Sequence, residues 1–302
     1  MPAAGLERGR CRHRPYTGGR TQVVNDTSPA AWRLIPSQPA SGAIHMALDQ
    51  ALLEAASGGS FHPSLRFYRW SPPALSLGRF QPLEEVDLEA CAAEGIEVVR
   101  RPTGGKSILH LDDFTYSIVI PRGFSLPDSV VEAYRLICRG ILCALEHLGL
   151  TAAIRSSEGD DYRLAGGACF AATTQADLEF AGRKLCGSAQ VRRKGALLQH
   201  GSILLEDRSE LLFRLLRFED EERRERDLEG YRRRCVALNE TGLRYSWEEV
   251  EASFMRGFQE SFGVEIEEGC LTTWEEKRRS VLNSAYSSSQ WLENAISDAL
   301  PS

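Results

Sequence analysis

The sequence lacks the features that mark membrane proteins and disulfide-rich secreted proteins. Along its 302 residues no apolar run approaches the roughly 20 residues that a membrane-spanning helix needs, so we expect no membrane partner. The eight cysteines form no CxxC pair and no Cys/His set at zinc-finger spacing, and no secretory signal is recognisable. We therefore expect no disulfide framework, no bound metal and a reducing, cytoplasmic location.

Motifs for binding nucleotides and nucleic acids are missing too. The P-loop pattern GxxxxGK[ST] does not occur, and no GxGxxG stands at a predicted strand–helix junction. With 36 Lys and Arg against 42 Asp and Glu, the net charge of −6 gives no reason to expect a nucleic-acid partner. There is no internal repeat, and a hydrophobic content of 42% is ordinary for a globular protein.

What the sequence does contain is a mixture of helix and strand patterns. Ser41 predicts the start of a helix that Gly58-Gly59 ends, and Ser129 with Glu132 forms a capping box before a long amphipathic helix. Segments dense in β-formers, such as Phe114 to Ile120, alternate with these helices. The pattern predicts an α+β fold, with mixed β-sheets packed against helices and a helical C-terminal segment.

Composition divides the chain into three parts. Residues 1–30 carry five arginines among glycine and proline, and we expect a disordered tail. Residues 31–250 are expected to form the main layered domain, and residues 251–302 a helical extension packed on it. Residues 206–234 are predicted to be helical with a charged, solvated face, and Thr273-x-x-Glu276 to cap a late helix.

The stretch from Ala165 to Leu205 is the most informative. A Gly-Gly pair leads into Cys169, and Lys184 follows a predicted strand. A basic turn at residues 192–195 joins two strands of a predicted β-hairpin. Small residues at 187–189 would let a ligand lie directly on the backbone of the first of these strands.

Two residues of this stretch are candidates for catalysis. Cys169 lies in a poorly apolar segment, where a thiol can reach a partly open site and act as a nucleophilic thiolate. Lys184 is a candidate proton acceptor and, when charged, would stabilise a thiolate or a developing oxyanion. The alternatives are an inert thiol at Cys169 and a solvated strand residue at Lys184.

A second candidate site is the run Arg-Arg-Pro-Thr-Gly-Gly-Lys at residues 100–106, which follows a predicted strand. It fits either a turn whose N–H groups face an anion or a carbonyl oxygen, or a purely structural turn. His110 and His200 lie on apolar strands, as substrate contacts or as hydrogen-bonded structural histidines. Asp49, on a helix beside Met46, either orients a loop or is an ordinary exposed residue.

Taken in order, these motifs resemble the lipoate/octanoate transferase family, whose fold is shared with the catalytic domain of biotin protein ligases. The similarity spans about residues 32–205, and the ordered set is specific although no single motif is. Arg-Arg-Pro-Thr-Gly-Gly, with Cys-Phe upstream of Gly-Arg-Lys, is similar to the octanoyltransferase branch called LipM. The motifs are Met46–Glu54, Arg66–Trp70, Ser76–Gly78, Phe80-Gln81, Arg100–Gly105, His110, Thr115–Ser117, Cys169-Phe170, Gly182–Lys184, Gly187–Gln190 and Gln199–Leu204.

The resemblance implies octanoyl transfer without ATP or metal. Cys169 would take the octanoyl group from octanoyl-acyl carrier protein as a thioester, with Lys184 polarising the carbonyl. A lysine of a lipoyl domain or of glycine cleavage protein H would then accept it as an amide. We expect a monomer. The expected substrate-binding residues are Arg101, Thr103, Gly104, Gly105, His110, Gly187, Ser188, Ala189, Gln190, His200 and Gly201.

Three other functions stay open on the sequence. One is an ATP-dependent lipoate-protein ligase, which would form an acyl-adenylate and would not depend on Cys169. Another is an amidotransferase that moves the acyl group from one lipoyl domain to another. The third is a non-catalytic protein that binds acylated carrier proteins.

Overall fold

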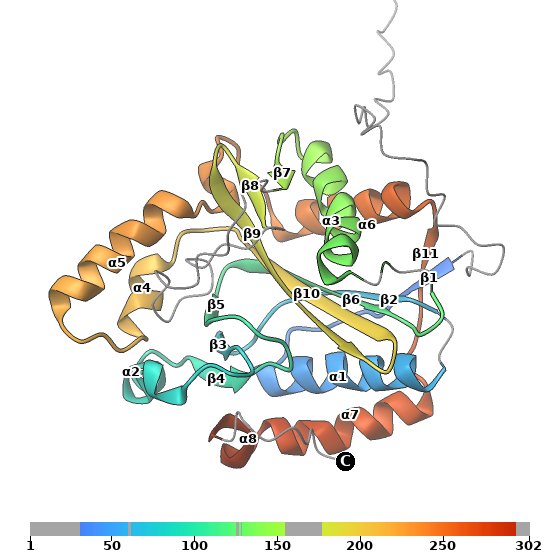
Figure 1. Cartoon of the computed structure of the whole chain (residues 1–302), viewed down its shortest axis with the longest axis horizontal. Coiled ribbons are helices and arrows are strands. Elements are labelled where there is room, and N and C mark those ends of the chain that lie inside the picture. The colour runs from blue at the N-terminus through green and yellow to red at the C-terminus, as the bar shows by residue number, and fades with distance from the viewer. Residues whose placement is uncertain (1–30, 60–61, 125–126, 128, 155–176, 294–302) are drawn as a thin grey trace, which may run out of the picture.

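A computed structural model describes residues 31–59, 62–124, 127, 129–154 and 177–293. Within these residues the strands form an eight-stranded sheet in the order β11-β1-β2-β6-β10-β9-β8-β7 and a three-stranded sheet in the order β4-β3-β5 (Figure 1). Cys169 and the predicted tail over residues 1–30 lie outside the described residues.

The strands of the large sheet are β1 (Ala31–Leu34), β2 (Ser64–Tyr68), β6 (Asp113–Ile120), β7 (Ala153–Ile154), β8 (Leu178–Phe180), β9 (Arg183–Arg193), β10 (Ala196–Leu204) and β11 (Glu265–Glu268). Those of the small sheet are β3 (Ala74–Leu77), β4 (Glu97–Arg100) and β5 (Ile108–His110). The α-helices are α1 (Gly42–Gly58), α2 (Leu88–Ala93), α3 (Val130–His147), α4 (Ser209–Arg214), α5 (Glu221–Arg234), α6 (Trp247–Phe262), α7 (Thr273–Tyr286) and α8 (Ser289–Glu293).

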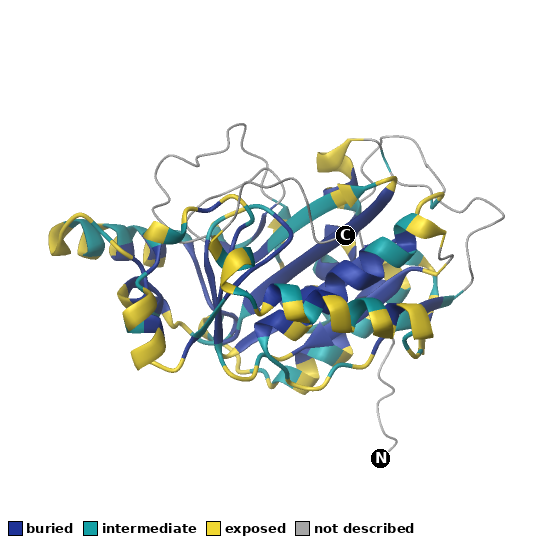
Figure 2. Ribbon diagram, turned by 90° about the horizontal axis from the view of Figure 1, so that it is seen from below, coloured by how far each residue is buried: buried dark blue, intermediate teal, exposed yellow. Residues whose placement is uncertain are grey.

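Helices cover both faces of the large sheet (Figure 1). On one face α3 and α6 pack over β6, where Tyr116, Ile137 and Phe254 belong to the largest hydrophobic cluster. On the other face α1 packs with Leu52 near Val119, and α7 lies against the outer side of α1. Every residue of β6 is buried, which explains its nearly continuous run of β-forming residues. Figure 2 shows the same layering, with buried strands at the centre and exposed residues on the outer helices.

The predictions for both ends of α1 and for the β9–β10 hairpin are confirmed. Ser41 accepts a hydrogen bond from the backbone N–H of Ile44 at the start of α1, and Gly59 ends that helix in the left-handed region at φ 111°. The β9–β10 turn has positive φ at Lys194 (47°) and Gly195 (87°). Two such residues in a two-residue turn match the twist of the hairpin strands.

The charged segment 206–234 is not one continuous helix, so that expectation was too coarse. It divides into α4 and α5, and residue Leu216 between them forms a β-bridge with Val86. Leu215 and Leu216 are both buried in the hydrophobic cluster of the small sheet. The helix is interrupted where these two leucines are buried. The charge pattern of the surrounding residues gave no indication of this interruption.

The cap of α7 lies one residue earlier than predicted. Thr272 and Glu275 form the capping box, whereas Thr273 and Glu276 were expected. Both Thr-x-x-Glu registers exist in the sequence. In the observed register the Glu275 carboxylate also pairs with Arg33 at 2.7 Å, which favours this start of the helix.

The C-terminal part contributes to the main sheet as well as to the helical layer. β11 pairs in parallel with β1, placing Ile266 opposite Trp32. The expected division at residue 250 falls inside α6, and the three-part organisation remains a prediction.

Candidate active site

A pocket lies where β9 and β10 of the large sheet meet the small sheet and the start of α1. Met46, Trp70 and Ile108 give it apolar walls. Seven of the expected substrate-binding residues line it: Arg101, His110, Gly187, Ser188, Ala189, His200 and Gly201.

One wall of the pocket is a stretch of β-hairpin with small side chains. In the β9–β10 register Gly201 lies opposite Ser188, and His200 opposite Ala189. A Cβ placed on Gly201 would lie 2.4 Å from Ser188 Oγ, 2.6 Å from the carbonyl oxygen of Gly187 and 2.8 Å from the Tyr116 ring. Only glycine fits at position 201, because a side chain there would collide with these neighbours. That a ligand lies on the backbone at residues 187–189 stays a prediction.

The other four expected binding residues lie outside the set that lines the pocket, and their contact with a ligand stays a prediction. Thr103 is buried and bonded to His200, while the Gly104 carbonyl accepts a hydrogen bond from Arg101. The carbonyl of Gly105 packs so tightly on Gly78 that no side chain fits at position 78. Gln190 Nε2 donates to the Gln199 side chain at 3.1 Å.

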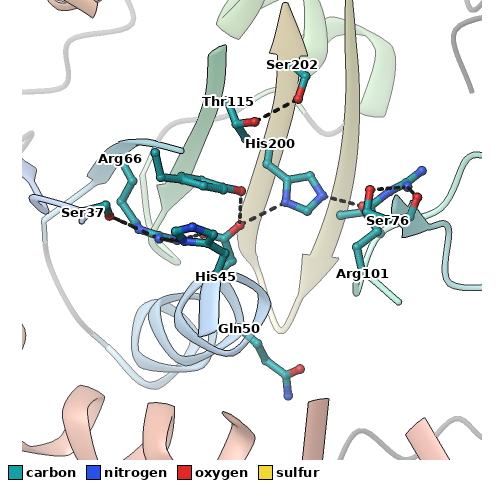
Figure 3. Close-up of polar contacts among 12 residues, drawn as sticks. Ser37, His45, Gln50, Arg66, Ser76, Arg101, Thr115, His200 and Ser202 are labelled. Atoms are coloured by element: carbon teal, nitrogen blue, oxygen red, sulfur yellow. Dashed lines mark hydrogen bonds and ion pairs between the residues drawn. The ribbon is translucent and has the colours of Figure 1, made fainter. Parts of the chain in front are cut away.

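His200 is the centre of a buried chain of polar contacts. Its Nδ1 lies 3.0 Å from Asp49 Oδ2, and its Nε2 lies 2.6 Å from Thr103 Oγ1. Asp49 also forms an ion pair with Arg66. Figure 3 shows the His200 ring between the Arg66–His45 pair on one side and Arg101 with Ser76 on the other. These polar contacts therefore link the turn at residues 102–105 to β10 and α1.

The buried charges among these polar contacts balance one another, because Asp49 is paired with Arg66. Burial alone would raise the pKa of Asp49, but the Arg66 guanidinium and the hydrogen bond to His200 hold that pKa below its ordinary value. Burial and the nearby Arg66 charge lower the pKa of His45 to about 3, so this ring is neutral. A neutral His45 can accept a hydrogen bond from Arg66 through Nδ1 (3.2 Å) and donate one to the Arg69 carbonyl through Nε2 (2.8 Å).

A second chain of the same type crosses the pocket through His110. Its Nδ1 lies 2.8 Å from Asp113 Oδ2, and its Nε2 lies 2.8 Å from Ser76 Oγ. Burial lowers the pKa of His110, although Asp113 opposes this, and the Trp70 ring stacks on it at 3.8 Å. Because the Asp113 carboxylate can only accept, Nδ1 carries the hydrogen, and the Nε2 lone pair faces the Ser76 hydroxyl. Arg101 Nη1 donates to the Ser76 carbonyl at 2.9 Å, which links the turn to this chain.

Lys184 is buried, so the alternative of a solvated strand residue is wrong. Its side chain is 3% exposed, and Nζ lies 3.1 Å from the buried carboxylate of Asp177. The residue lies on β9 three positions before Gly187, which corresponds to about 10 Å along a strand. Its catalytic role stays a prediction, as does that of Cys169.

Sequence reasoning singled out Asp49 without its partners, and it missed Asp113. Asp49 is fully buried, so the alternative of an ordinary exposed residue is wrong, and Asp113 is nearly fully buried. A signal existed for each: Asp49 interrupts the apolar helix face next to Met46 and Leu48, and Asp113 follows His110 at a spacing of three. Neither signal identifies the partner, because Asp49 and His200 are 151 residues apart in sequence.

Comparison with known proteins identifies the family. The profile of the family described as "Lipoyl protein ligase A/B catalytic domain" matches residues 41–259. The chain belongs to this family. Membership confirms the resemblance drawn from the motifs, and the mixed sheet with helices on both faces confirms the expected α+β fold.

Members of the family with a named activity cover most of the chain. Octanoyltransferase LipM of Geobacillus kaustophilus (strain HTA426) is 42% identical over 269 residues, which are 86% of this chain and 97% of that protein. Octanoyltransferase LipM of Symbiobacterium thermophilum is also 42% identical, over 267 residues and with the same two coverages.

Solved structures of similar proteins have the same fold. A bipartite lipoate protein ligase from Thermoplasma acidophilum superposes with a TM-score of 0.77 at 27% identity, covering 90% of this chain and all of that one. A lipoate-protein ligase A bound with ATP gives a TM-score of 0.72 at 27% identity, covering 88% and 100%. In the described part of this chain, no helix combines the length and hydrophobicity required to cross a membrane.

Proposed function

We propose that this family member is an octanoyltransferase that works through a thioester on Cys169. The donor is octanoyl-acyl carrier protein, and the acceptor is a lysine of a lipoyl domain or of glycine cleavage protein H. Two octanoyltransferases are 42% identical to the chain over 97% of their own length, which supports the activity. The cysteine motif Cys169-Phe170 ahead of Gly182-Arg183-Lys184 supports the route.

The observation that carries the proposal is the pocket itself. Its apolar walls and its wall of strand backbone at Gly187 and Gly201 suit an unbranched acyl chain, which needs contact area and few hydrogen bonds. The buried polar chains through His110 and His200 hold two sides of the pocket in place before a ligand arrives.

The chemistry is two successive exchanges at one carbonyl carbon. The Cys169 thiolate attacks the donor thioester, a C–S bond to Cys169 forms, and the C–S bond to the carrier breaks. The carrier leaves as a thiol with the proton that Cys169 lost. The acceptor amine then forms the C–N bond, the bond to Cys169 breaks, and an amine proton restores the thiol. No oxidant or nucleotide is consumed.

In this proposal Lys184 helps both exchanges. Each passes through a tetrahedral intermediate whose oxygen carries negative charge, and an ammonium held in a buried site stabilises that charge without reorganising. In the absence of substrate, the Asp177 carboxylate, 3.1 Å from Nζ, balances the positive charge of Lys184.

Mass spectrometry of the intact protein tests this function. Incubated with octanoyl-acyl carrier protein and no ATP, the chain should gain one octanoyl group, and subsequent addition of a lipoyl domain should remove it. Cys169→Ala should abolish both steps, whereas Cys270→Ala, which changes an exposed cysteine, should leave them intact. Normal acylation of the lipoyl domain by Cys169→Ala would overturn the assignment of the nucleophile.

An ATP-dependent lipoate or octanoate ligase is the second candidate. It is favoured by the likeness to a lipoate-protein ligase A bound with ATP, which extends over the whole of that chain. Transfer that requires ATP and the free acid, and that persists in Cys169→Ala, would establish it. Supplying an octanoylated lipoyl domain as donor separates the amidotransferase alternative, and binding of the carrier without any transfer would indicate a non-catalytic protein.

A further inference from the structure

Three side chains of metal-binding type converge between α3 and α6, the two helices that lie side by side on one face of the sheet (Figure 1). Cys143 and His147 are four residues apart on α3, so they share one face of that helix. Glu260 reaches them from α6. Cys143 Sγ lies 3.9 Å from His147 Nε2 and 3.6 Å from Glu260 Oε2, and His147 Nε2 lies 3.2 Å from Glu260 Oε1.

These separations fit a tetrahedral metal ion. Zinc binds thiolate sulfur at about 2.3 Å and imidazole nitrogen or carboxylate oxygen at about 2.0–2.1 Å, so ligand atoms in a tetrahedral site lie about 3.3–3.6 Å apart. The distance between Cys143 and Glu260 lies within that range, and the other two distances differ from it by a few tenths of an ångström at most. The sulfur and the imidazole approach different oxygens of the Glu260 carboxylate, and one ligand atom from each of the three residues lies within 4.8 Å of the others.

The backbone around the three side chains is held in place. Gly257, one turn before Glu260, lies directly on α3: a Cβ there would be 2.5 Å from the backbone nitrogen of Ala144, the residue after Cys143. Ser253 Oγ also donates to the Ala144 carbonyl at 2.6 Å. The spacing of the two helices beside the cluster is therefore set by backbone contact and does not need a metal to create it.

Burial and charge suit a thiophilic divalent ion. Cys143 is 2% exposed, whereas the side chains of His147 and Glu260 are 19% and 48% exposed. The sulfur is thus shielded, and the carboxylate side is open to water for entry of the ion. One thiolate and one carboxylate neutralise a charge of +2, and sulfur with imidazole favours Zn²⁺ over Mg²⁺ or Ca²⁺.

We propose that Cys143, His147 and Glu260 bind one Zn²⁺ ion, with water as the fourth ligand, and that the ion links α3 to α6. None of the three residues lines the acyl pocket, so the site is separate from the proposed transfer reaction. The sequence rules for zinc sites did not reveal it because the third ligand is 113 residues away along the chain from the second and on another helix.

Cobalt substitution tests the site with a readout that does not depend on activity. The full chain, stripped with a chelator and titrated with Co²⁺, should show a thiolate-to-cobalt charge-transfer band that Zn²⁺ abolishes at one equivalent per chain. Zn²⁺ should also raise the melting temperature of the stripped protein, because it binds the folded state. His147→Gln and Cys143→Ser should remove the band and the shift.

Matched controls are the exposed residues Cys270 and His62, where Cys270→Ser and His62→Gln should leave both signals unchanged. Glu260→Gln changes a half-exposed side chain with little effect on packing, and should weaken Zn²⁺ binding by at least the roughly tenfold to hundredfold lost when an outer-shell partner is removed. Absence of the band in the unmodified chain, its survival in folded His147→Gln, or an unchanged Zn²⁺ affinity in Glu260→Gln would overturn the proposal.

Discussion

Two regions of the molecule are built from acid–base pairs and use them differently. At the pocket, Asp49 and Arg66 form an ion pair and are 0% and 1% exposed, and Asp49 also contacts His200. On helix α5 the pair Arg226–Glu222 has side chains that are 57% and 85% exposed. Figure 2 shows α5 projecting at the left with mostly exposed and intermediate residues.

The difference teaches how much the same ion pair matters in each setting. In water, screening and side-chain entropy leave an exposed pair nearly without net effect. In the interior each charge needs its partner, because a lone buried charge has no water to solvate it. We therefore expect single substitutions at the pocket to be costly and those on α5 to be silent.

The largest effect is expected for Asp49→Asn. This change leaves Arg66 charged and buried without its counter-ion, and should lower the free energy of unfolding by about 3–5 kcal/mol. The contact to His200 would weaken as well, so octanoyl transfer should fall with stability. The urea unfolding midpoint measures the first effect; an unchanged midpoint would show that the pair is dispensable.

The second-largest effect on stability is expected at Gly201, whereas the same substitution at Gly104 should have none. Gly201→Ala forces a Cβ against the backbone of Gly187 and should destabilise the chain by about 1–3 kcal/mol, as overpacking does. Gly104→Ala meets nothing within 4 Å in the described structure, so its stability should not change. If position 104 contacts the acyl group as predicted, this variant should instead show a raised KM. Equal losses of stability in both variants would contradict the proposed wall geometry.

A smaller effect is expected in the pH dependence. Because the pKa of His45 is lowered from 6.5 to about 3, the unfolded chain binds a proton in that window that the folded chain does not. The free energy of unfolding therefore rises with pH across the window and falls toward acid, by up to about 1.4 kcal/mol per pH unit for one proton. His45→Gln should reduce this slope in urea titrations between about pH 6 and pH 4, and leave it unchanged near pH 8.

The smallest effect is expected on α5. Glu222→Gln removes one exposed partner of Arg226 and should leave the melting temperature within experimental error. A clear drop would show that the charges of α5 act as a network, and would remove the contrast with the pocket. Adding salt should then reproduce the drop in the unmodified chain.

Much of the fold could be predicted from the sequence where short-range chemistry decides. The caps at Ser41 and Ser129, the turn at Lys194-Gly195 and the strand at Phe114–Ile120 all depend on a few neighbouring residues. Only part of the candidate site could be predicted from the sequence. Its glycines, histidines and lysine form recognisable motifs, but Asp49 and Asp113 acquire their roles from residues brought to them by folding.

By itself the sequence determined the family, the α+β class and the boundaries of several elements, such as α1, β6 and the β9–β10 turn, because these follow from ordered motifs and from interactions within a turn or a hairpin. The tertiary structure alone decided which charges are buried together, which capping register begins α7, and which distant side chains gather between α3 and α6. The reason is physical: burial and long-range proximity are properties of the packed chain, and no local pattern of residues encodes them.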